Sequence, residues 1–304
     1  MRIGLLLNVL GTPLDAVVEQ ARDIAASGLG TAWLPEMGAW DALTAAAAIG
    51  PQVPGLALGT SVVPTYPRHP LTLAAQALTA QAATGNRFTL GVGVSHRHIV
   101  EGQFGHSYDR PARHLREYLS VLVPLLRGES VTHEGEAIKA AGAVTAPGAE
   151  PPALLVGALG PAMLRVAGEL ADGTITVWAG RAALADHIVP TITRAATRAG
   201  RPAPRVVVFK AVGVTADPEA RRATMAEQFS QVDQIPHYRA VLDRDGSAGP
   251  QDTAVLGDES TVEQALRELV DAGATELIAS PVGTPEEQSR TLALLAELTA
   301  STAS

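Results

Sequence analysis

Short apolar runs alternate along the chain with longer amphipathic stretches rich in Ala and Leu. Such runs, bounded by turn residues, are typical of buried strands, and the stretches between them are typical of helices that cover a sheet. The predicted strands are 2–7, 31–34, 56–63, 88–94, 153–157, 174–178, 206–214 and 276–280. The predicted helices are 14–27, 41–49, 71–83, 110–127, 161–171, 182–199, 218–231, 261–272 and 286–298.

This alternation of strand and helix predicts a (β/α)8 barrel, or TIM barrel, as a single α/β domain over residues 1–304. A doubly wound open sheet is the alternative that the pattern leaves open. No linker rich in Pro, Gly or Ser separates two cores. The longest interruptions, 97–110, 128–152 and 232–258, are expected to be insertions at the rim that shape a pocket, with a small hairpin or loop at 131–139.

Composition excludes several classes of protein. The chain of 304 residues is 46% hydrophobic and 18% charged, which is too apolar for a disordered protein. The absence of Cys excludes disulfides, thiolate zinc sites, iron–sulfur clusters and a thiol nucleophile. A net charge of −8 argues against nucleic acid as the main partner. No apolar run is long enough to span a membrane, and the first residues resemble a strand more than a signal peptide, so we expect a soluble cytoplasmic protein.

Several predicted strands end in residues that could carry chemistry, and the active sites of such barrels lie at the carboxyl ends of the strands. For Asn8 and Glu36, a role as a loop or capping residue is an equal alternative. Trp178 could stack on a flat cofactor or plug the barrel, whereas Trp33 is expected in the core. These strand-end positions are Asn8, Glu36, Thr60, Ser61, Val62, Ser95, His96, Gly157, Ala158 and Trp178.

The turn Gly157–Gly160 precedes a helix that begins at Pro161. Free N–H groups at such a helix start attract anions, so phosphate is a reasonable ligand. The sequence His96-Arg97-His98 also favours a negatively charged ligand, because its side chains are basic. A His-x-His pair can also bind a metal, but no acidic cluster at ligand spacing accompanies it, so we expect no metal site.

Three groups of motifs, taken in order, resemble the luciferase-like oxidoreductase superfamily. The first group is Leu58–Pro64 with Tyr66–Pro70 and Gly85–Gly93, the second is Gly157–Pro161 with Ala171–Gly173, and the third is Gly257–Asp258 with Asp271–Gly273. The chain is most similar to the branch that uses the deazaflavin coenzyme F420. That resemblance implies a (β/α)8 barrel, in agreement with the strand pattern.

The resemblance also implies a cofactor site. In relatives the ring lies over the ends of strands three and four, several have a non-proline cis peptide there that matches Ser61–Val62, and the phosphate-bearing tail lies near the turn after strand five. The implied cofactor-binding residues are Asn8, Thr60, Ser61, Val62, Gly93, Ser95, His98, Gly157, Ala158, Leu159, Gly160, Thr176 and Trp178.

The implied reaction is hydride transfer between deazaflavin C5 and a carbonyl, imine or activated alkene of a small-molecule substrate. Some relatives that oxidise sugar phosphates have His after strand two and Glu after strand four, and here the two types are exchanged, as Glu36 and His96. His96 is the first candidate for acid–base catalysis because an ordinary His titrates near neutral pH, and Glu36 is the second.

Three other functions remain open: an FMN-dependent monooxygenase of the same superfamily, a metal-dependent hydrolase that uses His96 and His98, and a non-catalytic flavin-binding relative. Relatives are commonly homodimers, and we expect the helices around 71–83 and 115–126 to form such an interface.

Overall fold

Eight parallel strands close into a barrel in the computed structural model, which describes residues 1–302, with the backbone alone at 233 and 302. The closing contacts run from β9 to β10, from β10 to β12 and from β12 to β1. In barrel order the strands are β1 (Arg2–Leu6), β2 (Thr31–Leu34), β3 (Ala57–Thr60), β5 (Phe88–Gly93), β8 (Ala153–Gly157), β9 (Gly173–Thr176), β10 (Arg205–Val214) and β12 (Glu276–Pro281). This closure confirms the predicted barrel and excludes the open sheet.

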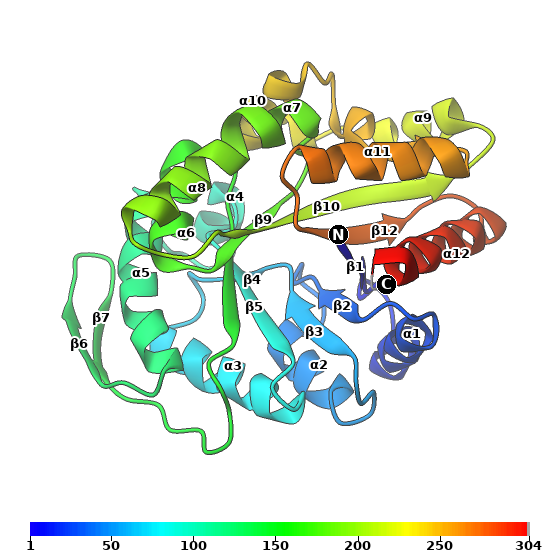
Figure 1. Ribbon diagram of the computed structural model, residues 1–304. Coiled ribbons are helices and arrows are strands. Elements are labelled where there is room, and N and C mark those ends of the chain that lie inside the picture. Colours follow the sequence, from blue (N-terminus) through cyan, green and yellow to red (C-terminus); the bar gives the residue numbers. More distant parts are fainter. Residues whose placement is uncertain (303–304) are drawn as a thin grey trace.

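Helices cover the outside of the barrel (Figure 1). Proline occupies the first turn of several of them, and aspartate side chains cap α2 (Ala42–Ile49), α9 (Pro218–Gln228) and α11 (Glu259–Asp271), which explains where these helices begin. The helices that return the chain between strands are α1 (Leu14–Ala26), α2 (Ala42–Ile49), α3 (Pro70–Ala83), α5 (Pro111–Leu126), α6 (Pro161–Leu170), α8 (Val189–Arg198) and α11 (Glu259–Asp271), and α12 (Pro285–Thr302) follows the last strand. Along residues 1–302, no helix combines the length and the apolar character needed to cross a bilayer.

The predicted insertions form additional elements. Residues 128–152 contain the antiparallel hairpin of β6 (Val131–Glu134) and β7 (Lys139–Gly142), which projects at the left of Figure 1. The segment after β5 contains α4 (Arg97–Gly102). The segment after β10 contains α9 (Pro218–Gln228), α10 (Pro236–Asp245) and β11 (Val255–Gly257), and α7 (Arg181–Ala183) with a π-helical turn (Leu184–Ile188) follows β9. The sequence pattern did not predict α4, α10 or β11.

A single indole fills much of the barrel interior. Trp33 is 1% exposed and packs with Leu155, Ile175, Val207 and Ile278. Glycines in the two neighbouring strands make room for it: a Cβ at Gly59 would lie 2.5 Å from the Trp33 ring, and one at Gly4 would lie 2.8 Å from its Nε1. The prediction that Trp33 belongs to the core is confirmed.

One boundary differs in a way that matters for the site. The predicted strand 56–63 is interrupted, because β3 ends at Thr60 and a two-residue strand, β4 (Val63–Pro64), pairs with β5. The bond between Ser61 and Val62 is cis, as the family resemblance implied.

Candidate active site

The mouth of the barrel, where the eight strands have their carboxyl ends, contains an apolar platform made by Val62. A Cβ added at Gly93 would lie 2.7 Å from Cγ2 of Val62, and one added at Gly157 would lie 3.3 Å from the same atom. The isopropyl group therefore lies over two strand ends, β5 and β8, that have no side chains of their own at these positions. Three predicted site residues are thus brought together, and the glycines are needed because any larger residue would displace Val62.

Two other predicted cofactor-binding residues are buried in the barrel. Thr60 and Thr176 are both fully buried. The Thr60 hydroxyl donates to the Gly91 carbonyl and accepts from the Gly91 amide, both at 2.9 Å, and so bridges β3 to β5. The Thr176 hydroxyl contacts the Val207 carbonyl at 3.5 Å. Both residues support the strand ends below the mouth, because their hydroxyls are directed at backbone groups.

Glu36 lies in an ion-pair network at the rim. Arg68 Nη1 donates to Glu36 Oε1 at 2.6 Å, and Arg68 Nη2 pairs with Asp41. The second Glu36 oxygen accepts from the Ala42 amide at 3.3 Å, so both of its oxygens are engaged. Burial opposes the charge on Asp41, but hydrogen bonds from Thr44 and Arg68 outweigh it and lower the pKa of this carboxyl. The network fixes the loop after β2 against the loop after β4.

His96 lies in a cluster of rings formed by two distant segments. Its Nε2 is 2.9 Å from the hydroxyl of Tyr238 on α10, and its ring centroid lies 5.3 Å from that of His237 and 5.7 Å from that of His98. Burial, followed by the neighbouring His237 and His98, lowers the pKa of His96 to about 4. The expectation that His96 titrates near neutral pH is therefore wrong, because burial, and after it these two neighbours, disfavour the imidazolium and leave a neutral ring at pH 7.

Tyr238 is the residue that the sequence did not reveal. It lies 142 positions from His96, on a helix that the pattern did not predict, so no local spacing could have linked the two. Burial is the main reason that the pKa of Tyr238 rises to about 12, so its hydroxyl keeps its proton.

Two residues after strand ends have the left-handed backbone that side chains rarely adopt. Ser95 has φ 58° and its carbonyl accepts from the Tyr108 hydroxyl at 2.9 Å, while Trp178 has φ 57°. Trp178 is 8% exposed and packs against Phe209 and Phe229, with ring centroids 5.9 and 4.9 Å away. Of its two predicted roles, stacking on a flat cofactor or plugging the barrel, this packing against protein rings favours the second.

The turn after β8 has the form expected of an anion site. Pro161 starts α6, and Gly160, the residue before it, offers no side-chain cap, so the first-turn N–H groups remain available. His187, from the π-helical turn, has its Nε2 2.9 Å from the Leu159 carbonyl. Ala158 is 3% exposed and donates its N–H to the Ile175 carbonyl at 3.3 Å.

Asn8 is exposed on the loop after β1, His98 is exposed on α4, and Ser61 is half-buried with its N–H bonded to the Leu34 carbonyl. The predicted residues therefore all belong to the strand ends of one end of the barrel and to the segments that follow them. Over residues 1–302, no group of three or more His, Asp or Glu side chains has the arrangement of a metal site.

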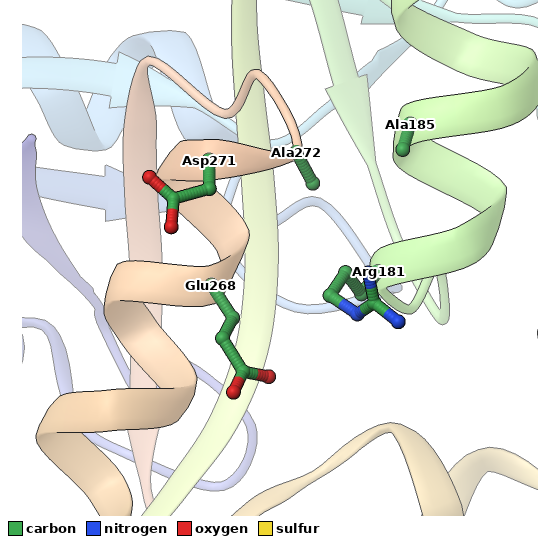
Figure 2. A pocket seen from close by; sticks show the side chains of 5 residues that line it. All are labelled: Arg181, Ala185, Glu268, Asp271 and Ala272. Carbon is green, nitrogen blue, oxygen red and sulfur yellow. The ribbon is translucent and has the colours of Figure 1, made fainter.

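A separate hollow of about 330 Å³ lies outside the barrel, between the segment that begins at α7 and the end of α11 (Figure 2). Arg181 and Ala185 line one side, and Glu268, Asp271 and Ala272 line the other. None of these is a predicted site residue. The mouth, with its platform, His96 cluster and anion turn, is the stronger candidate for chemistry.

The fold and this mouth define a luciferase-like barrel, and comparison with known proteins shows the family. The sequence model described as luciferase-like monooxygenase matches residues 2–302, so the chain belongs to that family.

Two curated relatives are similar in sequence. An F420-dependent glucose-6-phosphate dehydrogenase of Nakamurella multipartita is 30% identical over 274 residues, which is 82% of this chain and 78% of that protein. A Mycobacterium tuberculosis protein, provisionally named a coenzyme F420-dependent oxidoreductase, is 30% identical over 196 residues. That match covers 59% of this chain and little more than half, 56%, of the relative.

Solved structures share the fold at lower identity. An F420-dependent secondary alcohol dehydrogenase, in complex with an F420–acetone adduct, superposes with a TM-score of 0.80 at 17% identity and covers 97% of both chains. The FMN-bound oxygenating component of 3,6-diketocamphane monooxygenase from Pseudomonas putida superposes with a TM-score of 0.77 at 18% identity, covering 99% of this chain and 98% of that one.

Proposed function

We propose that this protein is an F420-dependent oxidoreductase that transfers hydride between the deazaflavin and a carbonyl, imine or activated alkene of a small organic substrate. The observation that carries the proposal is the Val62 platform over Gly93 and Gly157, with the uncapped start of α6 directly after the same strand, β8. An apolar surface suits a flat ring, and a helix N-terminus suits a phosphate. The names of the sequence relatives support F420 as the cofactor.

When bound, the deazaflavin supplies the hydride-carrying carbon, and the protein supplies orientation and proton handling. Val62 would support the ring, and the N–H groups at the start of α6 would bind the phosphate. The remaining residues of the proposed cofactor site are those that surround these two positions: Asn8, Ser61, Ser95, His98, Ala158, Leu159, Gly160 and Trp178, with Thr60 and Thr176 as buried supports.

His96 is proposed to accept a proton from a substrate hydroxyl, or to return it to a reduced carbonyl. In the tautomer whose Nε2–H donates to the Tyr238 oxygen, Nδ1 is the unprotonated ring nitrogen left to accept a proton from the substrate. The lowered pKa keeps His96 neutral at pH 7, so the base form is the resting form. Glu36 is the second candidate, and its engaged oxygens suit it to positioning the rim loop through Arg68.

The test separates chemistry from binding. His96→Ala should lower kcat by roughly 10²–10⁴-fold, the usual contribution of a general acid or base, while deazaflavin affinity changes little. Tyr238→Phe removes the hydrogen bond to His96 and keeps the ring, so it should shift the acidic limb of the kcat–pH profile without abolishing turnover. Unchanged turnover in His96→Ala would remove His96 from the proposal.

An FMN-dependent monooxygenase is the second candidate, because an FMN-bound enzyme shares the fold. Titration of the purified protein with F420 and with FMN, followed by fluorescence, distinguishes the two. Micromolar binding of F420 alone supports the proposal, whereas binding of FMN alone makes oxygen consumption the next measurement. A homodimer is also part of the proposal, and sedimentation velocity tests it.

A further inference from the structure

Large apolar side chains are exposed at the mouth of the barrel. Among the described residues, Leu10, Met37, Trp40 and Phe104 are 53%, 57%, 41% and 42% exposed, and all four lie on loops that follow β1, β2 or β5. Monomeric proteins seldom gather such side chains in one region without a ligand or partner to cover them. We call Leu10, Met37 and Trp40, which lie on the adjacent loops after β1 and β2, the rim patch.

The loops that present the rim patch are held in place. The Trp40 indole N–H donates to the Thr12 carbonyl at 2.8 Å, so the polar atom of the indole is satisfied by protein. The side chain of Gln20 bonds both backbone groups of Asn8, at 2.9 and 3.0 Å. The Glu36–Arg68–Asp41 network anchors the loop that carries Met37 and Trp40. The rim patch is therefore a preorganised surface rather than a loose loop, which reduces the entropy cost of binding to it.

The positive side chains on the loops around the rim patch have carboxylate partners. The mouth loops after β1, β2 and β4 contain one arginine, Arg68, which pairs with two carboxylates. In the loop after β5, Arg97 pairs with Glu101 and Arg110 with Glu136. A substrate with a phosphate or carboxylate would find no Arg or Lys on these loops without a carboxylate partner, so it would compete with that partner for the guanidinium.

We propose that the rim patch binds an uncharged apolar portion of the substrate, an alkyl chain or aromatic ring, while its reactive group lies over the Val62 platform. The position of the reactive group over the Val62 platform rests on the proposed function, whereas the binding of an apolar group at the rim patch does not. The loops of β1, β2 and β3 are neighbours in the barrel, so the rim patch is continuous with the rim of the proposed cofactor site. A sugar phosphate, which is polar and charged, does not fit this surface.

Tryptophan fluorescence tests the surface without turnover. Trp33 and Trp178 are 1% and 8% exposed, so quenching by acrylamide reports chiefly on Trp40. We would titrate cofactor-free protein with 1-octanol, with octanoate, which has the same chain length and a charge, and with glucose 6-phosphate. Octanol should protect Trp40 from acrylamide, octanoate should require an at least tenfold higher concentration, and the sugar phosphate should not protect.

Variants locate the effect. Met37→Ser should weaken octanol binding by about tenfold, as measured by calorimetry. Val270→Ser is the matched control, because Val270 is similarly exposed, at 41%, but lies on α11 outside the mouth, so its binding should equal that of the wild type. Sedimentation velocity of both variants tests the other occupant, a second copy of this chain.

The outcomes separate this inference from the proposed function. Protection by octanol without any F420-linked turnover supports the surface and refutes the proposed reaction. Turnover that favours a sugar phosphate, or equal protection by octanol and octanoate, overturns the inference and leaves the reaction standing. Absence of protection, or loss of a dimer in Met37→Ser alone, also overturns it, the latter because the rim patch would then be a contact between subunits.

Discussion

Adding one methyl group beneath Val62 tests how the candidate site is built. In Gly93→Ala the new Cβ would lie 2.7 Å from Val62 Cγ2, roughly 1 Å closer than an ordinary contact between two carbons. The φ angle at Gly93 is not positive, so alanine fits the backbone and only the collision matters. Overpacking of this kind costs about 1–3 kcal/mol, which the protein can relieve by turning Val62 out of its position.

The consequence should appear in binding more than in folding. If Val62 must return to its place to support the ring, the free energy of cofactor binding becomes less favourable by the same ~1–3 kcal/mol. This corresponds to an increase in Kd of about 5- to 150-fold. Val62→Ala alone removes two methyl groups from the platform and should cost about 1.5 kcal/mol, or roughly tenfold. The double variant has no collision left, so it should bind like Val62→Ala, with a coupling energy of about 1–3 kcal/mol.

The assay is an F420 titration of the four proteins, paired with urea unfolding. Gly91→Ala is the matched control within the same strand: its Cβ would lie 2.0 Å from the Thr60 carbonyl oxygen, which is backbone and cannot move aside. That variant should lose stability outright, by more than about 3 kcal/mol. Two results would refute the platform. One is equal F420 affinity in Gly93→Ala and in the wild type. The other is a double variant whose fold-loss of F420 affinity equals or exceeds the product of the two single losses.

Two predictions concern buried titratable groups. Burial lowers the pKa of His114, which is 8% exposed, to about 4, so the folded protein binds fewer protons than the unfolded chain between about pH 6.5 and 4. The free energy of unfolding should therefore fall as pH decreases through this window, by at most about 3 kcal/mol from this group. In His114→Gln, the free energy measured by urea unfolding should depend less steeply on pH. Burial also lowers the pKa of Lys210 to about 8, and its ammonium donates to the carbonyls of Ala179 and Thr253 at 2.5 and 3.0 Å. Wild-type stability should rise between about pH 8 and 10.5, where the folded protein has released this proton and the unfolded chain still binds it, whereas Lys210→Met should show no such rise from this group.

The barrel could be predicted from the sequence because its signals are local. Each strand is a short apolar run followed by an amphipathic helix, and Pro161 or Asp258 marks where a helix starts. The single predicted strand 56–63 is divided because the backbone changes course at Ser61–Val62, and no residue type in that run signals the change. The sequence pattern did not predict α4 and α10 because they are short helices inside long loops, with weak apolar periodicity.

The site was predicted less completely than the barrel, for a physical reason. Positions at strand ends can be read from the pattern, and these include His96, Val62 and Gly157. What each side chain does depends on partners that arrive from elsewhere: Tyr238 sets the environment of His96, and Arg68 engages Glu36. A pKa is likewise a property of the assembled neighbourhood, which is why a histidine expected to titrate near neutrality becomes one with a pKa of about 4.

Glycines explain how one barrel can hold a closed interior and an open mouth. Inside the barrel, Gly4 and Gly59 leave space that the indole of Trp33 fills, and this indole packs in a buried apolar cluster. At the carboxyl end, Gly93 and Gly157 leave space over which Val62 extends, and above it the strand ends present His96 and the start of α6. Substitution of alanine at Gly4 or Gly59 should therefore unfold the protein, whereas the same substitution at Gly93 or Gly157 should weaken ligand binding. The difference follows from what each absent side chain makes room for: a buried indole that must stay, or a platform residue that can turn away.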